Sequence, residues 1–318
     1  MSVHHRVLLT GATGHVGGRL LRQLLSCPTI STRALLRTSR DLPEWSGGAK
    51  IVIGDIREAS TRAKALHDID VVIHATRGFP ANTEPSRGQI EDERSTTKAF
   101  LQESIKLGVR RFIFLSSIHV YGASLSGLVH EEMPCQPLST YGISRKAIED
   151  DVLAASADSG METAVVRLSN SFGAPGFPRD DVWHLVVHDL CRQVVQSQSI
   201  SLRSDPRTCR DIIAMRDATN ILVQMVQSSE ILRGVFHLAS GQTIQIQELA
   251  QLVGNIAQNL YGFQVPIKSL QTDPIAPPTF TLDLKKLHRY GIRITNNRDI
   301  EIQDLLAYTR TVFGPSRQ

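Results

Sequence analysis

The sequence has few cysteines, few aromatic residues and no long apolar run, and these shortages exclude several classes of protein. Among its 318 residues are four cysteines, at positions 27, 135, 191 and 209, and no C-x-x-C pair, so neither a zinc knuckle nor a disulfide framework is indicated. No segment reaches the roughly 18 apolar residues of a membrane-spanning helix. The apolar run near the start is too short for a signal peptide. We therefore expect a soluble, cytoplasmic protein with buried free thiols and no membrane partner.

Charge of one sign is not concentrated anywhere in the chain either. Lys and Arg number 35 against 31 Asp and Glu, which gives a formal net charge of +4, and no run of five or six like charges occurs. This excess is too weak to indicate a nucleic-acid partner. Hydrophobic residues make up 41% and charged residues 21%, which is typical of a globular chain with a sizeable core.

The first half of the chain alternates between apolar runs and amphipathic stretches. Strand-like runs occupy residues 6–10, 32–37, 49–55, 70–76, 110–117 and 162–168. Stretches between them, such as 15–27 and 96–108, carry apolar residues at near-helical spacing. This alternation predicts an α/β fold in which a doubly wound parallel sheet has helices on both faces.

The second half is less regular. Residues 170–181 are rich in Gly and Pro and indicate a loop. Helices are expected at 181–196, 247–260 and 299–310, and strands at 199–204 and 234–239. We assign residues 1–170 to a dinucleotide-binding domain. Residues 171–318 are assigned to a smaller, interleaved substrate-binding region that partly returns to the first domain.

A glycine-rich turn follows the first strand and leads into a helix. In "LLTGATGHVGGRLL" Gly11 allows a tight turn, Gly14 lets the backbone approach a pyrophosphate, and Gly17 lets helix and strand pack closely. The helix start adds free N–H groups and a partial positive charge. The turn predicts a Rossmann-like cofactor site that includes Gly11, Thr13, Gly14, His15, Val16 and Gly17.

The G-x-x-G-x-x-G spacing resembles that of the short-chain dehydrogenase/reductase superfamily, and "TGATGHVG" resembles its extended branch, which includes the NAD(P)-dependent nucleotide-sugar epimerases and dehydratases. "FLSSIHVYG" resembles the family's S-x-x-V-Y-G, "RLSNSFGAPG" its R-x-x-N-x-x-G-P loop, and "CRDIIAMRDATN" its R-D-F-I-x-V-x-D segment. The resemblance implies Ser117 and Tyr141 as catalytic residues, and Asn170 and Arg210 as contacts to a sugar or diphosphate. It also implies that Asp55 bonds the adenine edge and that Ile56, Ala75 and Thr76 line the cofactor site.

Arg37 ends the second predicted strand, where NAD-binding folds place an acid that holds the ribose hydroxyls. A cation cannot accept hydrogen bonds from those hydroxyls, but it can bind a 2′-phosphate. Arg37, followed by Thr38, Ser39 and Arg40, therefore favours NADP over NAD. The alternative is an exposed arginine at a strand end.

The segment "YGISRKAIED" departs from the family motif, because Arg145 stands four residues after Tyr141 where a lysine is expected. Four residues advance a helix by about 400° and five by about 500°, so position 145 lies over Tyr141 and Lys146 points away. Free tyrosine has a pKa of about 10, so its reactive form needs a nearby cation. We expect Arg145 to supply that charge and to contact the cofactor ribose with altered geometry. The alternative is a degraded site.

Other departures bear on the reaction. Ile118 and His119 occupy the places of the dehydratases' Asp–Glu pair, which argues against dehydration, and His119 either contacts substrate or is merely hydrogen-bonded. Glu93 and Thr96 replace an Asn and a Gly, and "HATRG" replaces a motif that is usually His-x-Ala-Ala. We expect no metal site, because His184 and His188 lack a third ligand.

Together these residues predict an NAD(P)-dependent epimerase, most often at C4 in this family, that transfers hydride on a nucleotide-diphosphate sugar through a keto intermediate. One alternative is an NADPH-dependent reductase of a ketosugar or another ketone. The other is a cofactor-binding sensor or scaffold without catalysis. The resemblance also implies a homodimer built from helices at about 91–107 and 139–158.

Overall fold

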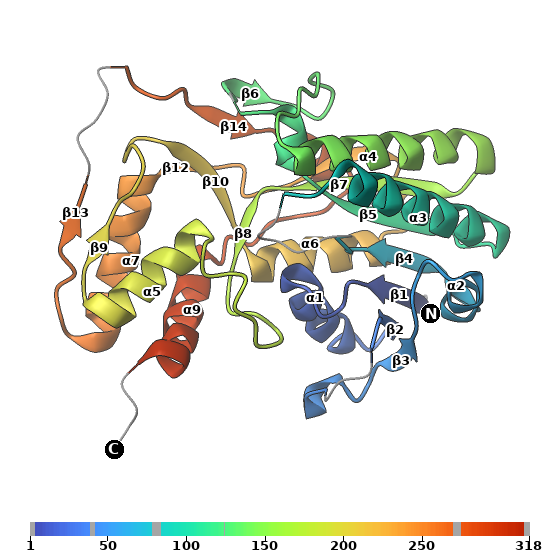
Figure 1. Cartoon of the computed structure of the whole chain (residues 1–318), viewed down its shortest axis with the longest axis horizontal. Helices are drawn as coiled ribbons and strands as arrows, with labels where there is room; N and C mark the ends of the chain where they lie inside the picture. Colours follow the sequence, from blue (N-terminus) through green and yellow to red (C-terminus); the bar gives the residue numbers. More distant parts are fainter. Residues whose placement is uncertain (1–3, 39–41, 78–83, 124, 270–274, 315–318) are drawn as a thin grey trace.

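A seven-stranded parallel sheet forms the centre of the protein (Figure 1). The computed structural model describes residues 4–38, 42–77, 84–123, 125–269 and 275–314. The strands run in the order β11-β7-β5-β4-β1-β2-β3, and every neighbouring pair is parallel. Their bounds are β1 His5–Thr10, β2 Ile30–Leu36, β3 Lys50–Ile53, β4 Val71–His74, β5 Arg111–Ser117, β7 Glu162–Leu168 and β11 Gly234–Leu238. The predicted Rossmann-like α/β fold is confirmed.

Helices cover both faces of this sheet, as the sequence predicted. Helices α1 (His15–Leu25) and α6 (Met215–Gln227) pack together on one face. The other face carries α2 (Ala59–Leu66), α3 (Arg87–Lys106) and α4 (Thr140–Ser159). Side chains alternate between the two resulting cores, because successive strand residues point to opposite faces. In β1, Val7 and Leu9 join the core with α1, whereas Leu8 joins the core with α3.

The second half builds a smaller body with its own core, at the left of Figure 1. Three helices, α5 (Val186–Ser197), α7 (Ile246–Tyr261) and α9 (Arg298–Phe313), pack on one another. A three-stranded sheet of order β12-β10-β8 lies between these three helices and the central sheet. The remaining elements are β6 Gly127–Val129, β8 Asn170–Phe172, β9 Ile200–Ser201, β10 Cys209–Ala214, β12 Thr243–Gln245, β13 Ile267–Lys268, β14 Phe280–Leu282, α8 Lys285–Arg289, η1 Glu44–Ser46 and η2 Ile118–Tyr121.

Two predicted boundaries in this half are wrong. The loop expected at 170–181 begins with strand β8, which pairs in parallel with β10. Its three residues are too few to show strand periodicity, and its partner lies about 40 residues later. The helix expected from residue 181 begins at Val186, because residues 181–184 form turns. These turns nevertheless bury Val182 and Trp183, which explains their helix-like apolar character.

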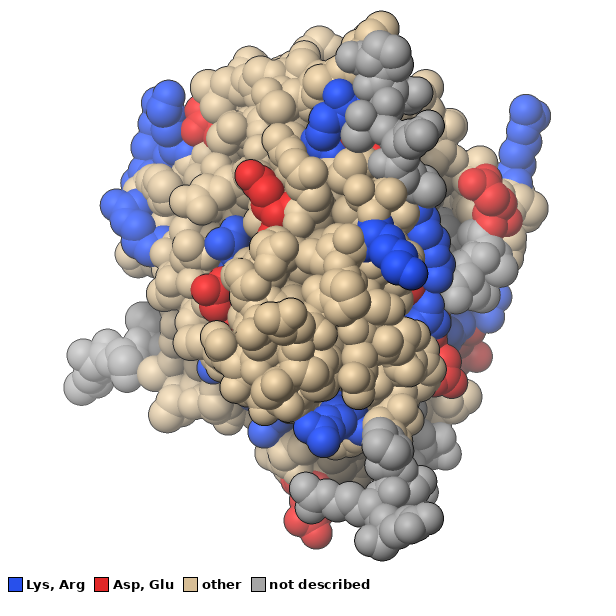
Figure 2. All heavy atoms as spheres, turned by 90° about the vertical axis from the view of Figure 1, so that its left-hand side faces the viewer, with Lys and Arg blue, Asp and Glu red and all other residues tan. Residues whose placement is uncertain are grey.

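The surface carries charges of both signs. Figure 2 shows the α5–α7 end of the molecule, where scattered Lys, Arg, Asp and Glu side chains surround a mainly uncharged central area. No helix in the described ranges is long and apolar enough to cross a membrane.

A buried polar network ties α4 to the sheet at the edge where the strands end. Arg167 on β7 donates to the Glu149 carboxylate on α4 at 2.7 Å, and Ser116 on β5 donates to the same carboxylate at 2.6 Å. Arg167 also donates to the Tyr121 hydroxyl at 2.7 Å. Because a buried charge is tolerated only when it is paired and hydrogen-bonded, this network fixes the position of α4 relative to β5.

Buried histidines give the fold an acid-sensitive stability. Burial lowers the pKa of His74 to about 3 and the pKa of His188 and His237 to about 4. An unfolded histidine titrates near about 6.5. Below that pH the unfolded chain therefore binds protons that the folded chain does not, and the free energy of unfolding falls as pH falls, by up to about 1.4 kcal/mol per pH unit for each histidine.

We predict that His74→Asn weakens this dependence. Between pH 7 and pH 5 the loss in free energy of unfolding should be about 2 kcal/mol smaller in the variant than in the wild type, because one proton-binding group is removed from the unfolded state. Urea unfolding followed by circular dichroism at several pH values measures it. The exposed His288→Asn serves as control, and equal pH slopes in His74→Asn and wild type would contradict the prediction.

Candidate active site

The glycine-rich turn lies between β1 and α1, and no side chain fits at its key positions. Gly11 has a φ of +73°, and a Cβ atom there would overlap the Ala75 carbonyl. A Cβ at Gly17 would overlap the Gly11 carbonyl. The Gly14 N–H donates to Gly11 O at 2.8 Å, and Gly14 then caps α1. The turn thus brings bare backbone and a helix N-terminus to the carboxyl edge of the sheet, as a dinucleotide pyrophosphate requires.

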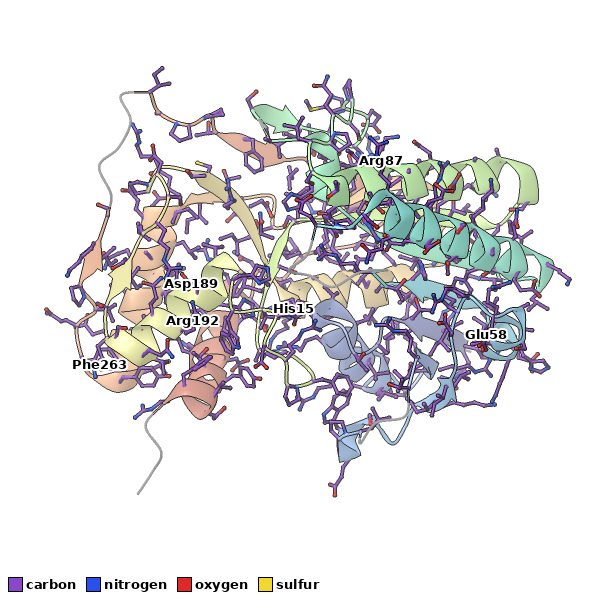
Figure 3. All side chains as sticks on the ribbon, viewed as in Figure 1. His15, Glu58, Arg87, Asp189, Arg192 and Phe263 are labelled. Atoms are coloured by element: carbon purple, nitrogen blue, oxygen red, sulfur yellow. The ribbon has the colours of Figure 1, made fainter. Side chains whose placement is uncertain are left out.

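A segment from the second half closes over this turn. The Arg179 guanidinium donates to Thr13 O at 3.2 Å and forms an ion pair with Asp181. His15 lies at the junction between α1 and α5, with its ring 5.2 Å from that of His188 (Figure 3). Burial lowers the pKa of His15 well below its usual value, and His188 lowers it further. Within the described ranges the buried His15 ring nitrogens have no hydrogen-bond partner.

The predicted adenine end is more open. Arg37 is exposed, and Asp55 and Ile56 are half-buried. Arg57 donates to the Asp55 carboxylate at 2.9 Å, and this bond holds the pKa of Asp55 below its usual value. Ser39 and Arg40, which were predicted to follow Arg37 at this site, lie outside the described residues.

Ser117 and Tyr141 come to the same edge of the sheet. Ser117 ends β5, and its Oγ accepts a hydrogen bond from the His119 N–H at 3.3 Å. Tyr141 lies in the first turn of α4, which Ser139 caps through the Gly142 N–H at 3.1 Å. The His119 and Tyr141 rings lie 6.1 Å apart, nearly edge to face. His119 therefore lies next to both the serine and the tyrosine.

Arg145, and not Lys146, lies beside Tyr141. The Arg145 guanidinium carbon is 5.5 Å from the Tyr141 ring centroid, whereas Lys146 pairs with Asp150 at the surface. Arg145 is 2% exposed and forms an ion pair with the buried Glu93 on α3. Burial acts to lower the pKa of Arg145, but Glu93 and Tyr141 outweigh it and the net direction is upward. Glu93 and Arg145, which the sequence shows as two separate departures from the family pattern, thus form one ion pair.

Arg77 is a second cation at Tyr141 that sequence reasoning missed. Its guanidinium carbon lies 4.4 Å from the centroid of the Tyr141 ring. Burial lowers the pKa of nearby His119, and Arg210 and Arg77 lower it further. The available signal was the arginine in "HATRG", at a place where the resembled motif usually has alanine.

The predicted substrate contacts lie on the strands that lead out of the second half. Asn170 begins β8 and donates to Asp211 O at 2.9 Å. Arg210 is exposed on β10, where it donates to Cys209 O at 3.0 Å. The adjacent Asp211 carboxylate is buried and accepts from Ser169 at 2.6 Å. Arg210 lowers the pKa of His119, whose ring faces that of Tyr141.

Backbone space and donors in this region fit a dinucleotide. Thr13 lies half-buried in the turn and Val16 half-buried in the first turn of α1, and Ala75 and Thr76 follow β4 directly opposite the glycine-rich turn. No group of three His, Cys, Asp or Glu side chains in the described part of the chain could hold a metal ion.

The fold and this site define a dinucleotide-binding α/β protein with a serine and a tyrosine at the carboxyl edge of its sheet. A model of the NAD dependent epimerase/dehydratase family matches residues 7–238, and the chain belongs to that family.

Curated relatives carry several reactions. The chain is 26% identical to UDP-glucose 4-epimerase of Vibrio cholerae over 82% of this chain and 78% of that protein. It is 25% identical to sterol demethylase protein B of Methylococcus capsulatus, over 91% and 88%. A dTDP-glucose 4,6-dehydratase of Streptomyces antibioticus matches at 24%, over 78% and 76%.

Solved structures share the fold. UDP-glucuronic acid 4-epimerase of Bacillus cereus, in complex with UDP-glucuronic acid and NAD, superposes with a TM-score of 0.79 at 20% identity. The alignment covers 96% of this chain and 99% of that one.

We predict that Gly17→Ala weakens cofactor binding. The added methyl group would force the Gly11 carbonyl out of place, and overpacking of this kind costs about 1–3 kcal/mol. Where this cost falls on the cofactor-binding conformation, the affinity drops by roughly 5- to 150-fold. Isothermal titration with NAD and NADP measures the change. Gly88→Ala is the matched control, because its nearest neighbour would be Ser86 Oγ at 3.8 Å. Unchanged affinity in Gly17→Ala would place the cofactor elsewhere.

Proposed function

We propose that the protein is an NAD(P)-dependent epimerase of a nucleotide-diphosphate sugar that inverts one ring carbon, at C4, through a keto intermediate. The observation that carries the proposal is the convergence of Tyr141, Ser117 and two guanidinium groups at the sheet edge beside the glycine turn. Membership of the epimerase/dehydratase family supports it, as do relatives named as UDP-glucose 4-epimerases.

The chain's own residues divide into two tasks under this proposal. Tyr141 takes the proton of the sugar hydroxyl as the hydride leaves the same carbon, and it returns that proton after the ketone has turned its other face. Ser117 Oγ donates a hydrogen bond to the reacting oxygen, while a neighbouring cation stabilises the tyrosinate. The residues that hold the cofactor are Gly11, Thr13, Gly14, His15, Val16, Gly17, Arg37, Asp55, Ile56, Ala75, Thr76, Tyr141 and Arg145. When bound, its nicotinamide ring accepts the hydride and gives it back.

We assign substrate recognition to Arg210, Asn170 and His119. Arg210 suits a diphosphate by its charge and fork geometry, and Asn170 and His119 complete the contacts. The proposal does not include dehydration, because the Ile118 side chain has no ionisable proton and cannot act as a general acid or base. Because a dehydratase is among the relatives, membership of the family does not exclude dehydration, and only Ile118 and His119 speak against it.

A second candidate is an NADPH-dependent reductase of a ketone, either a ketosugar or a non-sugar compound. Arg37 favours it, since a cation at the end of β2 suits the 2′-phosphate of NADP. The relative named as sterol demethylase protein B, which matches 91% of the chain, supports a non-sugar substrate within this second candidate.

Three further features belong to the proposal. We place the cofactor domain at residues 1–170 and the substrate region at 171–318. A homodimer through α3 and α4 is consistent with their side-by-side packing (Figure 1) and with the exposed Ile143 on α4. The third feature of the proposal is a cytoplasmic location.

The assay that tests the proposal mixes purified protein with UDP- and dTDP-sugars and either NAD or NADPH. We expect sugar interconversion, followed by NMR, without net consumption of cofactor. Tyr141→Phe should lower the rate by about 100-fold or more, because it removes the acid/base group. Tyr261→Phe in α7 is the control. NADPH consumption would favour the reductase, and cofactor binding with neither result would favour a sensor.

The cofactor preference has its own test. Arg37→Asp should weaken NADP binding by about 10- to 100-fold, the worth of a charge-assisted hydrogen bond, and leave NAD binding nearly unchanged. Arg289→Asp makes the same charge change at an exposed position of α8. Equal effects of the two variants on NADP would mean that Arg37 only contributes to the general surface charge.

A further inference from the structure

Two guanidinium groups lie near Tyr141, and their surroundings differ. Arg145 approaches from one turn further along α4, and Arg77 approaches from the segment after β4. The family resemblance, together with helix geometry, assigns the role of tyrosinate-stabilising cation to Arg145. That assignment takes no account of what else Arg145 contacts.

Arg145 has its charge balanced inside the protein. It forms an ion pair with Glu93, donates to Thr76 O at 3.3 Å and lies 5.4 Å from the Phe114 ring centroid. The Glu93 carboxylate also accepts from Ser144 at 2.9 Å. Arg145 still interacts with Tyr141, but the anion in contact with it opposes the attraction that Arg145 would exert on a tyrosinate.

Arg77 is closer to the ring and less buried. Its guanidinium carbon is 4.4 Å from the Tyr141 centroid, against 5.5 Å for Arg145. Arginine remains protonated in proteins, and a guanidinium over a tyrosine face is attracted to the ring electrons. That attraction grows when the phenol becomes a phenolate.

We propose that Arg77 is the cation that stabilises the tyrosinate form of Tyr141, and that Glu93 is a positioning residue that holds Arg145 in an internal ion pair. The inference rests on the hydride-transfer function proposed above. In the step concerned, the phenolate oxygen forms a bond to the proton of the substrate hydroxyl. That O–H bond breaks, a C=O bond forms, and the hydride leaves the same carbon for the oxidised nicotinamide.

Glu93 and Asp181 also act electrostatically on Arg77, but Glu93 is in direct contact with Arg145, and Arg77 lies nearer to the Tyr141 ring than Arg145 does. His119 faces the ring from η2, but burial, Arg210 and Arg77 lower its pKa, so it is neutral at pH 7. Arg210 acts on His119 from β10. At the start of α4, Thr140 donates to Glu84 at 2.8 Å, which adds an anion.

The test compares pH–rate profiles of five variants with that of the wild type. Arg77→Gln removes the nearer charge and Arg77→Lys restores it. Glu93→Gln frees the charge of Arg145, and Glu93→Gln with Arg145→Met removes both members of the ion pair. Tyr141→Phe identifies the signals of the phenol. Thermal melting checks that each variant is folded.

Removing Arg77 should move the acidic limb of the profile up by about one pH unit, a tenfold loss of rate on that limb, and Arg77→Lys should reverse most of it. Glu93→Gln should move the limb to lower pH. The double variant should lower the plateau without moving the limb. If the double variant moves the limb upward and Arg77→Gln does not, Arg145 is the working cation and the proposal is overturned.

A readout that needs no turnover separates this inference from the proposed function. Tyrosine labelled with ¹³C at Cζ reports phenol ionisation by NMR in the NAD-bound protein, and Tyr141→Phe assigns the signal. A titration that moves upward in Arg77→Gln supports the inference even if no sugar is converted. Conversion of a sugar together with an unmoved titration in Arg77→Gln overturns the inference and leaves the proposed function standing.

Discussion

The buried ion pair between Glu93 on α3 and Arg145 on α4 is the constraint on which the site depends. Burying two charges is costly unless they meet each other and further hydrogen-bond partners. Here Ser144 and Thr76 O supply such partners, so the pair holds α3, α4 and the segment after β4 in one arrangement. Tyr141 lies one helical turn from Arg145, and that arrangement decides where its ring lies.

A second buried ion pair, between Glu149 and Arg167, lies near the same edge of the sheet. Glu149, one turn beyond Arg145 on α4, binds Arg167 on β7 and Ser116 on β5. Together the two pairs attach α4 to α3 on one side and to the sheet on the other. Ser117 follows Ser116 directly, so the position of the serine relative to the tyrosine follows from polar contacts beneath them. Buried polar contacts thus support the positions of both residues, as a site that depends on fixed distances requires.

Local patterns made much of this predictable. Strands β1 to β5 follow from apolar runs, and the positive φ of Gly11 follows from the glycine spacing. Helix periodicity also placed Arg145, and not Lys146, beside the tyrosine. Contacts between distant segments were not predictable: Glu93 is 52 residues from Arg145, and nothing in either segment indicates the other. For the same reason the short β8, defined by its pairing with β10, was expected to be a loop.

The departures from the family pattern are mutually consistent when charge is counted. In the resembled motifs this region contributes a lysine, an asparagine and an alanine, whose net charge is +1. This chain has Arg145, Glu93 and Arg77 in those places, and their net charge is also +1. A degraded site would lose charge or geometry without compensation. Here each added charge contacts another member of the set or the tyrosine itself. Under the proposed function, the positive charge that an acid/base tyrosine needs would thus be kept, although a different residue would supply it.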